Sequence, residues 1–493
     1  MRSCGILMPI FSLPSRYGIG NFGKEAYNFV DFLYKAGQSY WQILPLNPTN
    51  YGDSPYQSFS SYAGNPYFID PDTLIDEGLL TKKEAESFEF FVDADKVDYG
   101  KLYENRAKLL KLAHNRFSKT DQYRDYIKKN AFWLNDYALF MSIKNEFNDA
   151  SWTEWPKPLR VRDKAVLNEK RQALADGIDF YCFIQYQFDK QWKALKSYAN
   201  EKGIKIIGDI PIYVALDSAD VWAEPQQFLL DNNLKPKKVA GCPPDAFSED
   251  GQLWGNPLYN WKIMKEDGYS WWKKRMGYAL ELYDLIRIDH FRGFESFYAI
   301  PFGDRDAKGG RWMKGPNIDL FRALENEFGK DLPIIAEDLG FLTPAVLKML
   351  KESGFPGMKV LQFAFDDREE NDYLPHNFGK NCVVYTGTHD NDTILGWTKS
   401  ASVASVDQAY RYTGFSGSEG FNWTLMRLAL MSVADTCILM MPDLISLGTE
   451  GRINTPSTLG CNWTWRMGVG LANDWLAKLV YDNVCLYGRL PEK

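Results

Sequence analysis

Several residue types and patterns are scarce in this sequence of 493 residues, and each scarcity excludes a class of protein. Only four histidines are present, so a multi-histidine metal site would need most of them. The seven cysteines are scattered and form no CxxC pair, which is typical of reduced thiols in a cytoplasm and not of a disulfide framework or a zinc site. No apolar run approaches the ~20 residues that a membrane span needs. Pro9 interrupts the apolar stretch near the N-terminus, so we expect no signal peptide and a cytoplasmic location.

Positive charge is not in excess either. The 57 Lys and Arg residues are outnumbered by 64 Asp and Glu residues, so the net charge of −7 gives no sign of a surface for nucleic acid or anionic membranes. A hydrophobic content of 45% with 25% charged residues excludes a disordered chain. Aromatic residues, in contrast, are abundant, because 16 Trp, 28 Tyr and 31 Phe make up 15% of the chain.

Eight short apolar runs end in polar or glycine-rich loops, and helix-like segments separate several of them. Runs without polar alternation are typical of strands buried on both faces, as in parallel sheets. Eight such strands alternating with helices predict an α/β fold, a (β/α)8 TIM barrel. The predicted strands cover residues 5–10, 41–46, 204–214, 285–289, 333–337, 358–365, 381–386 and 436–441.

The spacing of these runs is uneven, which predicts one catalytic barrel over residues 1–493 with insertions. Residues 50–200, between the second and third strands, indicate a mainly helical insertion subdomain. Residues 215–270 are rich in Pro, Gly and Trp and indicate a loop insertion that covers the active site. The motif GIGNFG at residues 18–23 matches a dinucleotide fingerprint, but no acidic residue follows ~20 positions later, so we favour an ordinary barrel loop.

Acidic residues stand at four of the predicted strand ends, where the chemistry of a TIM barrel is found. Asp209 lies within the apolar run 204–214, Asp289 and Glu337 close the next two runs, and Asp390 follows the run 381–386. A single acidic residue in such a place is usually a helix cap or a solvated loop residue. Four of them on successive segments indicate cleavage of a glycosidic bond, which in a retaining enzyme needs a carboxylate nucleophile and a carboxylic acid about 5 Å apart.

The neighbours of these residues suggest which role each has. Arg287 precedes Asp289 by two positions, so both side chains project to one face of a strand, and the guanidinium favours an ionised nucleophile. Glu337 follows an apolar strand that should raise its pKa and keep it protonated as the acid. Asp390 would then bind sugar hydroxyls. A purely structural Arg287–Asp289 ion pair is an equally good interpretation of that pair alone.

Aromatic and amide residues gather in three segments near these strands, around Tyr56, Trp254 and Trp463. Aromatic faces pack against the C–H surfaces of sugars, and planar polar groups bind their hydroxyls. Most Trp and Tyr residues serve only packing, but the polar neighbours of these three favour contact with a ligand.

At these residues the sequence resembles the amylomaltases or disproportionating enzymes, the 4-alpha-glucanotransferases of glycoside hydrolase family 77 in the α-amylase clan. The resemblance runs nearly end to end. It is carried by PPDAFS at 243–248, WGNP at 254–257, RIDHFRG at 287–293, AEDLG at 336–340 and THDN at 388–391.

The resemblance implies that Asp289 is the nucleophile, Glu337 the acid/base and Asp390 the transition-state stabiliser. It implies transfer of 1,4-α-glucan segments between maltooligosaccharides or amylose chains, with neither a cofactor nor a metal. Ser457 stands where such enzymes usually have glycine, a departure that concerns acceptor preference. The implied glucose-contacting and subsite residues are Arg287, His389, Asp209, Ser54, Tyr56, Trp254 and Asn462.

Three alternatives stay open at the level of sequence. An amylase-type hydrolase would share all the carboxylates. A glycan-binding protein on a barrel without chemistry would have lost one of them, yet all three are present. A metal-dependent barrel hydrolase would have few ligands, because His114 and His376 lie away from the strand-end motifs.

Overall fold

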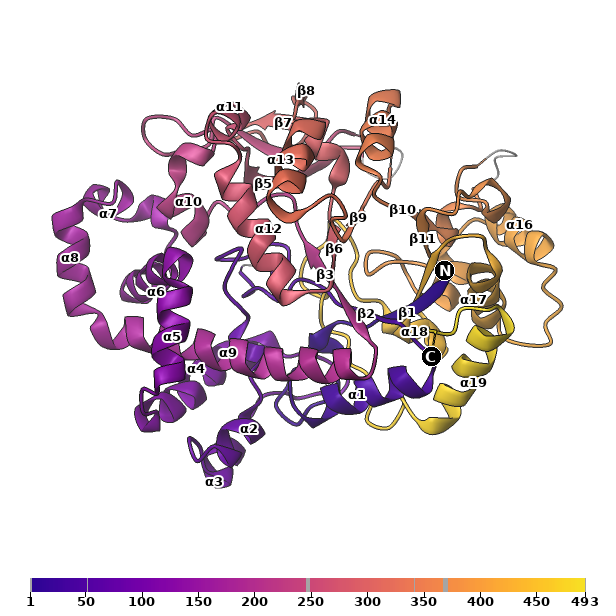
Figure 1. The fold of residues 1–493 in the computed structure, drawn as a ribbon, viewed down its shortest axis with the longest axis horizontal. Helices are drawn as coiled ribbons and strands as arrows, with labels where there is room; N and C mark the ends of the chain where they lie inside the picture. Colours follow the sequence, from indigo (N-terminus) through magenta and orange to yellow (C-terminus); the bar gives the residue numbers. More distant parts are fainter. Residues whose placement is uncertain (1, 51, 245–248, 341, 367–370, 493) are drawn as a thin grey trace.

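The computed structural model describes residues 2–50, 52–244, 249–340, 342–366 and 371–492. Its centre is a parallel sheet that curves round into a nearly closed barrel (Figure 1), which confirms the predicted TIM barrel. The strands are ordered β10-β11-β12-β1-β2-β3-β6-β9. Their bounds are β1 (Ser3–Leu7), β2 (Tyr40–Gln42), β3 (Lys205–Ile210), β6 (Leu285–Ile288), β9 (Ile334–Ala336), β10 (Gly357–Val360), β11 (Cys382–Tyr385) and β12 (Thr436–Met440).

Each barrel strand overlaps one of the eight predicted runs but is shorter than the run. The predicted third run extended to residue 214, whereas β3 ends at Ile210 because Pro211 follows it and has no N–H to donate to a ladder. Ile206 and Ile207 within β3 are fully buried, as expected for a strand covered on both faces. Ile212 and Tyr213, which follow β3 in that run, line the mouth of the barrel instead.

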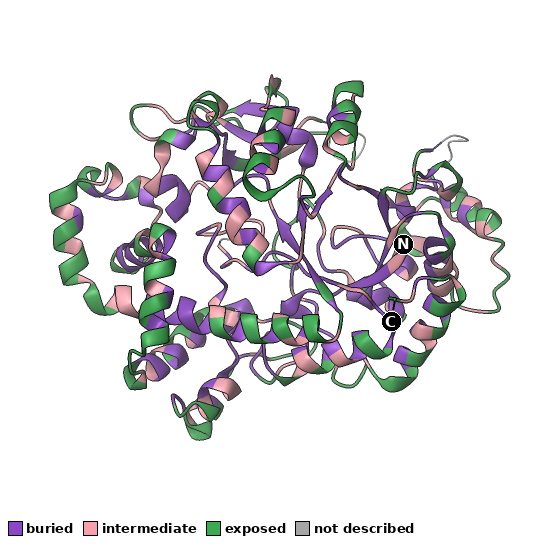
Figure 2. Ribbon diagram, viewed as in Figure 1, coloured by how far each residue is buried: buried purple, intermediate pink, exposed green. Residues whose placement is uncertain are grey.

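Helices cover the outside of the barrel, with buried faces toward the strands and exposed faces toward solvent (Figure 2). In α1, Phe29 and Leu33 are buried, one turn apart on the same face. The helices in this layer are α1 (Lys24–Lys35), α9 (Ala175–Glu201), α12 (Ser270–Leu282), α13 (Ile318–Phe328), α14 (Pro344–Ser353), α15 (Ile394–Ser400), α16 (Val403–Thr413), α17 (Phe421–Met431), α18 (Met441–Leu444) and α19 (Asp474–Leu486). No helix in the described ranges has both the length and the apolarity to cross a bilayer.

Between β2 and α9 the chain forms a helical region on one side of the barrel (Figure 1). The last helix of the predicted range 50–200, α9, packs against α1 and β3, so it belongs to the barrel layer. The remaining helices are α2 (Pro71–Asp76), α3 (Lys82–Glu86), α4 (Tyr99–Arg116), α5 (Asp121–Lys129), α6 (Ala131–Glu146), α7 (Lys157–Arg160) and α8 (Lys164–Ala173).

A second, antiparallel sheet lies beside the mouth of the barrel, and the sequence did not predict it. Its order is β5 (Gln252–Pro257), β4 (Lys238–Cys242), β7 (Ser296–Pro301) and β8 (Arg311–Lys314). Two strands come from the segment after β3, which also holds α10 (Ala219–Ala223) and α11 (Trp261–Glu266), and two come from the segment after β6. The range 215–270 is therefore partly regular structure, and not only the loop that its Pro and Gly content suggested.

The glycine-rich segment 18–23 forms the loop that enters α1, as expected. A Cβ atom on Gly20 would lie 1.9 Å from the carbonyl oxygen of Ile10, so glycine is required there by close backbone packing.

Candidate active site

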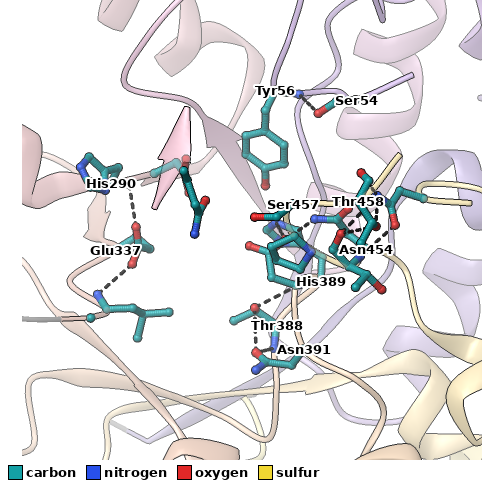
Figure 3. Close-up of a pocket in the computed structure, with 18 of the residues that line it drawn as sticks. Ser54, Tyr56, His290, Glu337, Thr388, His389, Asn391, Asn454, Ser457 and Thr458 are labelled. Carbon is teal, nitrogen blue, oxygen red and sulfur yellow. Dashed lines mark hydrogen bonds and ion pairs between the residues drawn. The ribbon is translucent and has the colours of Figure 1, made fainter. Parts of the chain in front are cut away.

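A cleft of about 1240 Å³ opens at the carboxyl ends of the barrel strands. Its walls include Asp289, Glu337 and Asp390, which come from the ends of β6, β9 and β11. Barrel closure thus brings together three carboxylates that are separated by about a hundred residues of sequence. Figure 3 shows Glu337 and His290 on one side of this cleft and His389 and Tyr56 on the other.

Arg287 holds two carboxylates at the base of the cleft. Its Nη1 lies 2.8 and 2.7 Å from the two carboxylate oxygens of Asp209, and its Nη2 lies 3.0 Å from Oδ1 of Asp289. The register of β3 and β6 sets Asp209 beside Arg287, so both side chains point to the same face. The Asp289 side chain is 29% exposed and reaches the cleft. The predicted pairing of Arg287 with Asp289 is therefore present.

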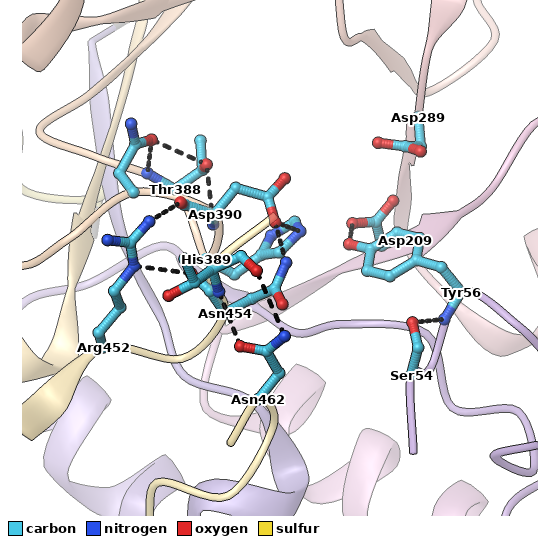
Figure 4. A network of polar contacts seen from close by, with 12 residues as sticks. Ser54, Tyr56, Asp209, Asp289, Thr388, His389, Asp390, Arg452, Asn454 and Asn462 are labelled. Carbon is cyan, nitrogen blue, oxygen red and sulfur yellow. Dashed lines mark hydrogen bonds and ion pairs between the residues drawn. The ribbon is translucent and has the colours of Figure 1, made fainter. Parts of the chain in front are cut away.

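Asp209 does not line the cleft. Its side chain is fully buried, and its second partner is the hydroxyl of Tyr56, which donates to Oδ2 at 2.7 Å (Figure 4). The resemblance implied that Asp209 lines a sugar subsite. The structure instead places it beneath Arg287 and Tyr56, where it fixes their positions.

Glu337 follows β9, and the backbone holds its carboxylate on both sides. Oε2 accepts the N–H of His290 at 2.7 Å, and Oε1 accepts the N–H of Leu339 at 2.8 Å. His290 has a φ of 53°, a left-handed conformation that turns its N–H toward Glu337. Non-glycine residues adopt this region at a cost of about 1–2 kcal/mol, and here the strained turn directly follows Asp289.

The electrostatics of the carboxylates differ in one respect from the expectation. Burial raises the pKa of Glu337, as predicted from its apolar strand. Burial also raises the pKa of Asp289, and it outweighs the lowering effect of Arg287, while the neighbouring carboxylates of Glu337 and Asp209 add to the rise. Arg287 lowers the pKa of Asp289, as expected, but the effect of burial is larger. The same guanidinium also binds Asp209.

Asp390 lies in the loop after β11, across from Asp289, and residues from a distant segment hold it in place (Figure 4). The amide of Asn454 donates to Oδ1 at 2.6 Å, and Nη2 of Arg452 donates to the backbone carbonyl at 3.0 Å. Nε2 of His389 lies 3.4 Å from the same Oδ1. Neither Asn454 nor Arg452 was predicted, since no strand end or aromatic cluster marks them in the sequence.

Aromatic rings form the wall next to Asp390. The ring of Tyr56 stacks on that of His389 with centroids 5.2 Å apart and planes 19° from parallel, and Trp463 packs 5.8 Å from each. Burial lowers the pKa of His389, although Asp390 opposes this effect. A neutral imidazole in this position can both donate and accept a hydrogen bond.

The three remaining predicted residues also line the cleft. The hydroxyl of Ser54 accepts the N–H of Tyr56 at 3.2 Å, so it shapes the turn that carries this ring. Trp254 packs edge-on against His290 with centroids 4.9 Å apart. Asn462 closes the loop 455–462, because its Oδ1 accepts the N–H of Thr455 at 2.9 Å while its Nδ2 donates to the carbonyl of Thr458 at 2.9 Å.

Residues 245–248 of the PPDAFS motif lie outside the described residues. Within the described ranges, no group of three or more His, Cys, Asp and Glu side chains is arranged to hold a metal ion. His114 contacts Asp179 in the helical region, and His376 contacts Tyr412, both away from the cleft.

Comparisons with known proteins show the family of this chain. The family profile of the 4-alpha-glucanotransferases, glycoside hydrolase family 77, matches residues 8–471. A 4-alpha-glucanotransferase of Clostridium butyricum is 49% identical over 98% of this chain and 100% of that protein. One from Thermus thermophilus is 46% identical over 94% of this chain and 95% of its own.

Solved structures give the same result. The amylomaltase of Streptococcus agalactiae in complex with acarbose superimposes with a TM-score of 0.97 at 41% identity, over the whole of both chains. The amylomaltase of Corynebacterium glutamicum is 17% identical and shares the fold, with a TM-score of 0.79 over 99% of this chain and 75% of that one. From its profile match, its relatives and its fold, the chain belongs to the 4-alpha-glucanotransferases of glycoside hydrolase family 77.

Proposed function

We propose that this enzyme transfers segments of 1,4-α-glucans by a retaining double displacement with a covalent glucosyl-enzyme intermediate. The donors and acceptors are maltooligosaccharides, amylose or other α-1,4-glucans. The observation that carries the proposal is the shared cleft of Asp289, Glu337 and Asp390, in which Arg287 contacts Asp289 and no cation contacts Glu337 among the described residues.

In the first step, Asp289 Oδ attacks the anomeric carbon while Glu337 protonates the leaving 4-oxygen of the glucan. Because burial raises the pKa of both carboxyl groups, the pair retains a proton at a pH where an isolated carboxyl group has lost it. We assign this proton to Glu337, since the ion pair with Arg287 stabilises negative charge on Asp289.

In the second step, Glu337 removes the proton from the 4-hydroxyl of an acceptor glucan, and that oxygen displaces Asp289 from the anomeric carbon. Asp390 and His389 bind hydroxyls of the bound glucose and stabilise its distorted ring. Transfer outcompetes hydrolysis when an acceptor sugar is held in place of water. The rings of Tyr56, Trp254 and Trp463 offer the apolar surface for this, and Ser54 and Asn462 shape the loops that present it.

Incubation with maltotriose distinguishes transfer from hydrolysis. Transfer produces glucose and a ladder of longer maltodextrins while the total number of reducing ends stays constant. Hydrolysis raises that number with time. A rise in reducing ends that matches the consumption of maltotriose would make this enzyme an amylase-type hydrolase.

The substitution Asp289→Asn tests the nucleophile. It keeps the size of the side chain and removes the attacking charge, so we expect turnover to fall by more than about 10³-fold while glucan binding is retained. Turnover within tenfold of the unsubstituted enzyme would refute the assignment. Binding without turnover in the unsubstituted enzyme would point to the glycan-binding alternative.

A further inference from the structure

Seven of the eight contacts between neighbouring barrel strands are parallel ladders, and the contact between β9 and β10 differs from them. Strands β9 and β10 form no ladder among the described residues, although they are neighbours in the closed barrel. The N–H of Ala336 donates to the carbonyl of Pro356 at 2.9 Å. In a parallel ladder the next bond would run from the N–H of Met358 to the carbonyl of Ala336. Instead, the N–H of Met358 donates to the side-chain Oδ1 of Asp338 at 2.6 Å.

We propose that Asp338 is a positioning residue that closes the barrel between β9 and β10 and thereby fixes the acid/base Glu337. Its carboxylate takes the place of a strand carbonyl at the point where the chain leaves β9. It is 5% exposed and is not among the residues that line the cleft, so it does not touch the substrate.

The opposite strand is shaped to receive this carboxylate. A Cβ atom on Gly357 would lie 2.6 Å from Oδ2 and 2.8 Å from Oδ1 of Asp338. The carboxylate therefore packs against the bare Cα of the first residue of β10. Gly357 has no left-handed backbone conformation, so a side chain is excluded there by Asp338 and not by the backbone dihedrals.

Asp338 completes a set of bonds that holds Glu337 from both sides. Toward β6, the N–H of Glu337 donates to the carbonyl of Ile288 at 3.0 Å, and its carbonyl accepts the N–H of Phe291 at 3.0 Å. Toward β10, the first bond after Ala336 is that of Asp338. Among the described residues, the other bonds that join the backbone of Glu337 to a neighbouring strand run toward β6, so loss of the Asp338 bond loosens residues 337–340 on the β10 side. That segment includes Leu339, whose N–H binds the Glu337 carboxylate, so both the backbone and the carboxylate of Glu337 would shift.

This inference rests on the acid/base role proposed for Glu337, and the leaving group of the substrate gives a specific test. Maltotriose needs a proton on its leaving oxygen, whereas α-maltotriosyl fluoride releases fluoride without one. Misplacement of the acid therefore slows the first reaction and largely spares the second. General loss of structure, or damage to the nucleophile, slows both.

The experiment compares Asp338→Ala and Gly357→Ala with the unsubstituted enzyme, in maltotriose transfer and in single-turnover release of fluoride. We expect each variant to lose about 10²-fold on maltotriose and less than about tenfold on the fluoride, in line with the usual size of general acid catalysis. Because both substitutions break one contact, the double variant should lose little more than either single one. Asp338→Asn keeps an oxygen that can accept the Met358 N–H and should stay within about threefold on both substrates.

Asp70→Ala is the matched control. Asp70 is also 5% exposed and accepts one backbone N–H and one hydroxyl, both of Thr73, but it caps α2 far from the cleft. We expect it to lower the apparent Tm without separating the two substrates. An equal loss on both substrates for Asp338→Ala and Gly357→Ala would overturn the inference.

Glu337→Gln distinguishes a failure of the acid role of Glu337 from a failure of the positioning role of Asp338. If its fluoride release is preserved and its maltotriose transfer is lost, the acid role holds, and only the behaviour of the Asp338 variants bears on the positioning role. If Glu337→Gln loses both activities equally, the proposed function of Glu337 fails, and the inference fails with it.

Discussion

The substitution Asp443→Asn should stabilise this protein in a manner that depends on pH. Asp443 follows β12 and is fully buried. Its Oδ1 accepts the N–H of Ile394 at 2.7 Å, and its Oδ2 accepts the hydroxyl of Thr386 at 3.1 Å. These two partners stand at the two ends of the loop that carries Asp390. Burial, with a further contribution from the nearby Asp392, raises the pKa of Asp443 from 3.8 to about 7.

The direction of the effect follows from proton linkage. Between pH 3.8 and about 7 the folded protein keeps a proton on Asp443 that the unfolded chain has lost. Folding stability therefore falls as the pH rises through this window, by about 1.4 kcal/mol per unit. Over roughly three units the cost approaches about 4 kcal/mol, and it is fully present by pH 8. Asparagine has the same shape, stays neutral, can accept the Ile394 N–H and can donate to Thr386.

Apparent Tm values measured at one scan rate, at pH 4.5 and at pH 8, test this prediction. We expect Asp443→Asn to raise the Tm clearly at pH 8 and to change it little at pH 4.5. Asp443→Ala leaves the Ile394 N–H without its partner, which costs about 1–3 kcal/mol at either pH. A Tm of Asp443→Asn below that of the unsubstituted protein at pH 8, or an identical shift at both pH values, would refute the reasoning.

Three further predictions concern the cleft. Ser457 has a φ of 63°, so Ser457→Gly should relieve about 1 kcal/mol of strain and raise the apparent Tm, whereas Ser457→Ala should not. EDTA should leave maltotriose transfer unchanged, and strong inhibition would contradict chemistry based on carboxylates alone. Asp209→Asn leaves more of the Arg287 charge to Asp289, so the acidic limb of the pH profile of kcat/KM should move to lower pH. An acidic limb that stays in place or moves to higher pH would contradict the view that Asp209 and Asp289 share the charge of Arg287.

The barrel could be predicted from the sequence because its strands are buried on both faces. Even β9, three residues long, is marked by the apolar run that ends at Ala336. The antiparallel sheet could not be predicted in the same way. In β5 the first four residues are exposed or half-buried and only the last two are buried, and the partners of β4 come from two separate segments of the chain. Such a sheet depends on pairings over a long sequence distance and not on any local pattern.

In the candidate site, too, local sequence pattern predicts some residues, and contacts between distant segments add others. Asp289 and Glu337 could be found because each directly follows a strand, and Asp390 because it lies in the loop after β11; strand ends meet at one mouth of a barrel. Asn454 and Arg452 could not, because their contacts with Asp390 arise only when the chain returns after β12. Local pattern thus predicts which groups are present in the cleft, while distant contacts decide how each group is held.

Asp209 and Arg287 show why a correctly predicted pairing leaves part of the electrostatics unpredicted. Two-residue spacing on one strand was enough to predict that Arg287 contacts Asp289. The register between β3 and β6, which no local pattern specifies, adds Asp209 on the other side of the same guanidinium. One positive charge then faces two carboxylates. The buried Asp209 makes two contacts with the guanidinium, and Asp289 makes one. Asp209 therefore fixes the position of Arg287 and also weakens its effect on Asp289. Burial of Asp289 and the nearby carboxylates of Glu337, Asp209 and Asp390 raise its pKa against Arg287, although the guanidinium lies 3.0 Å away.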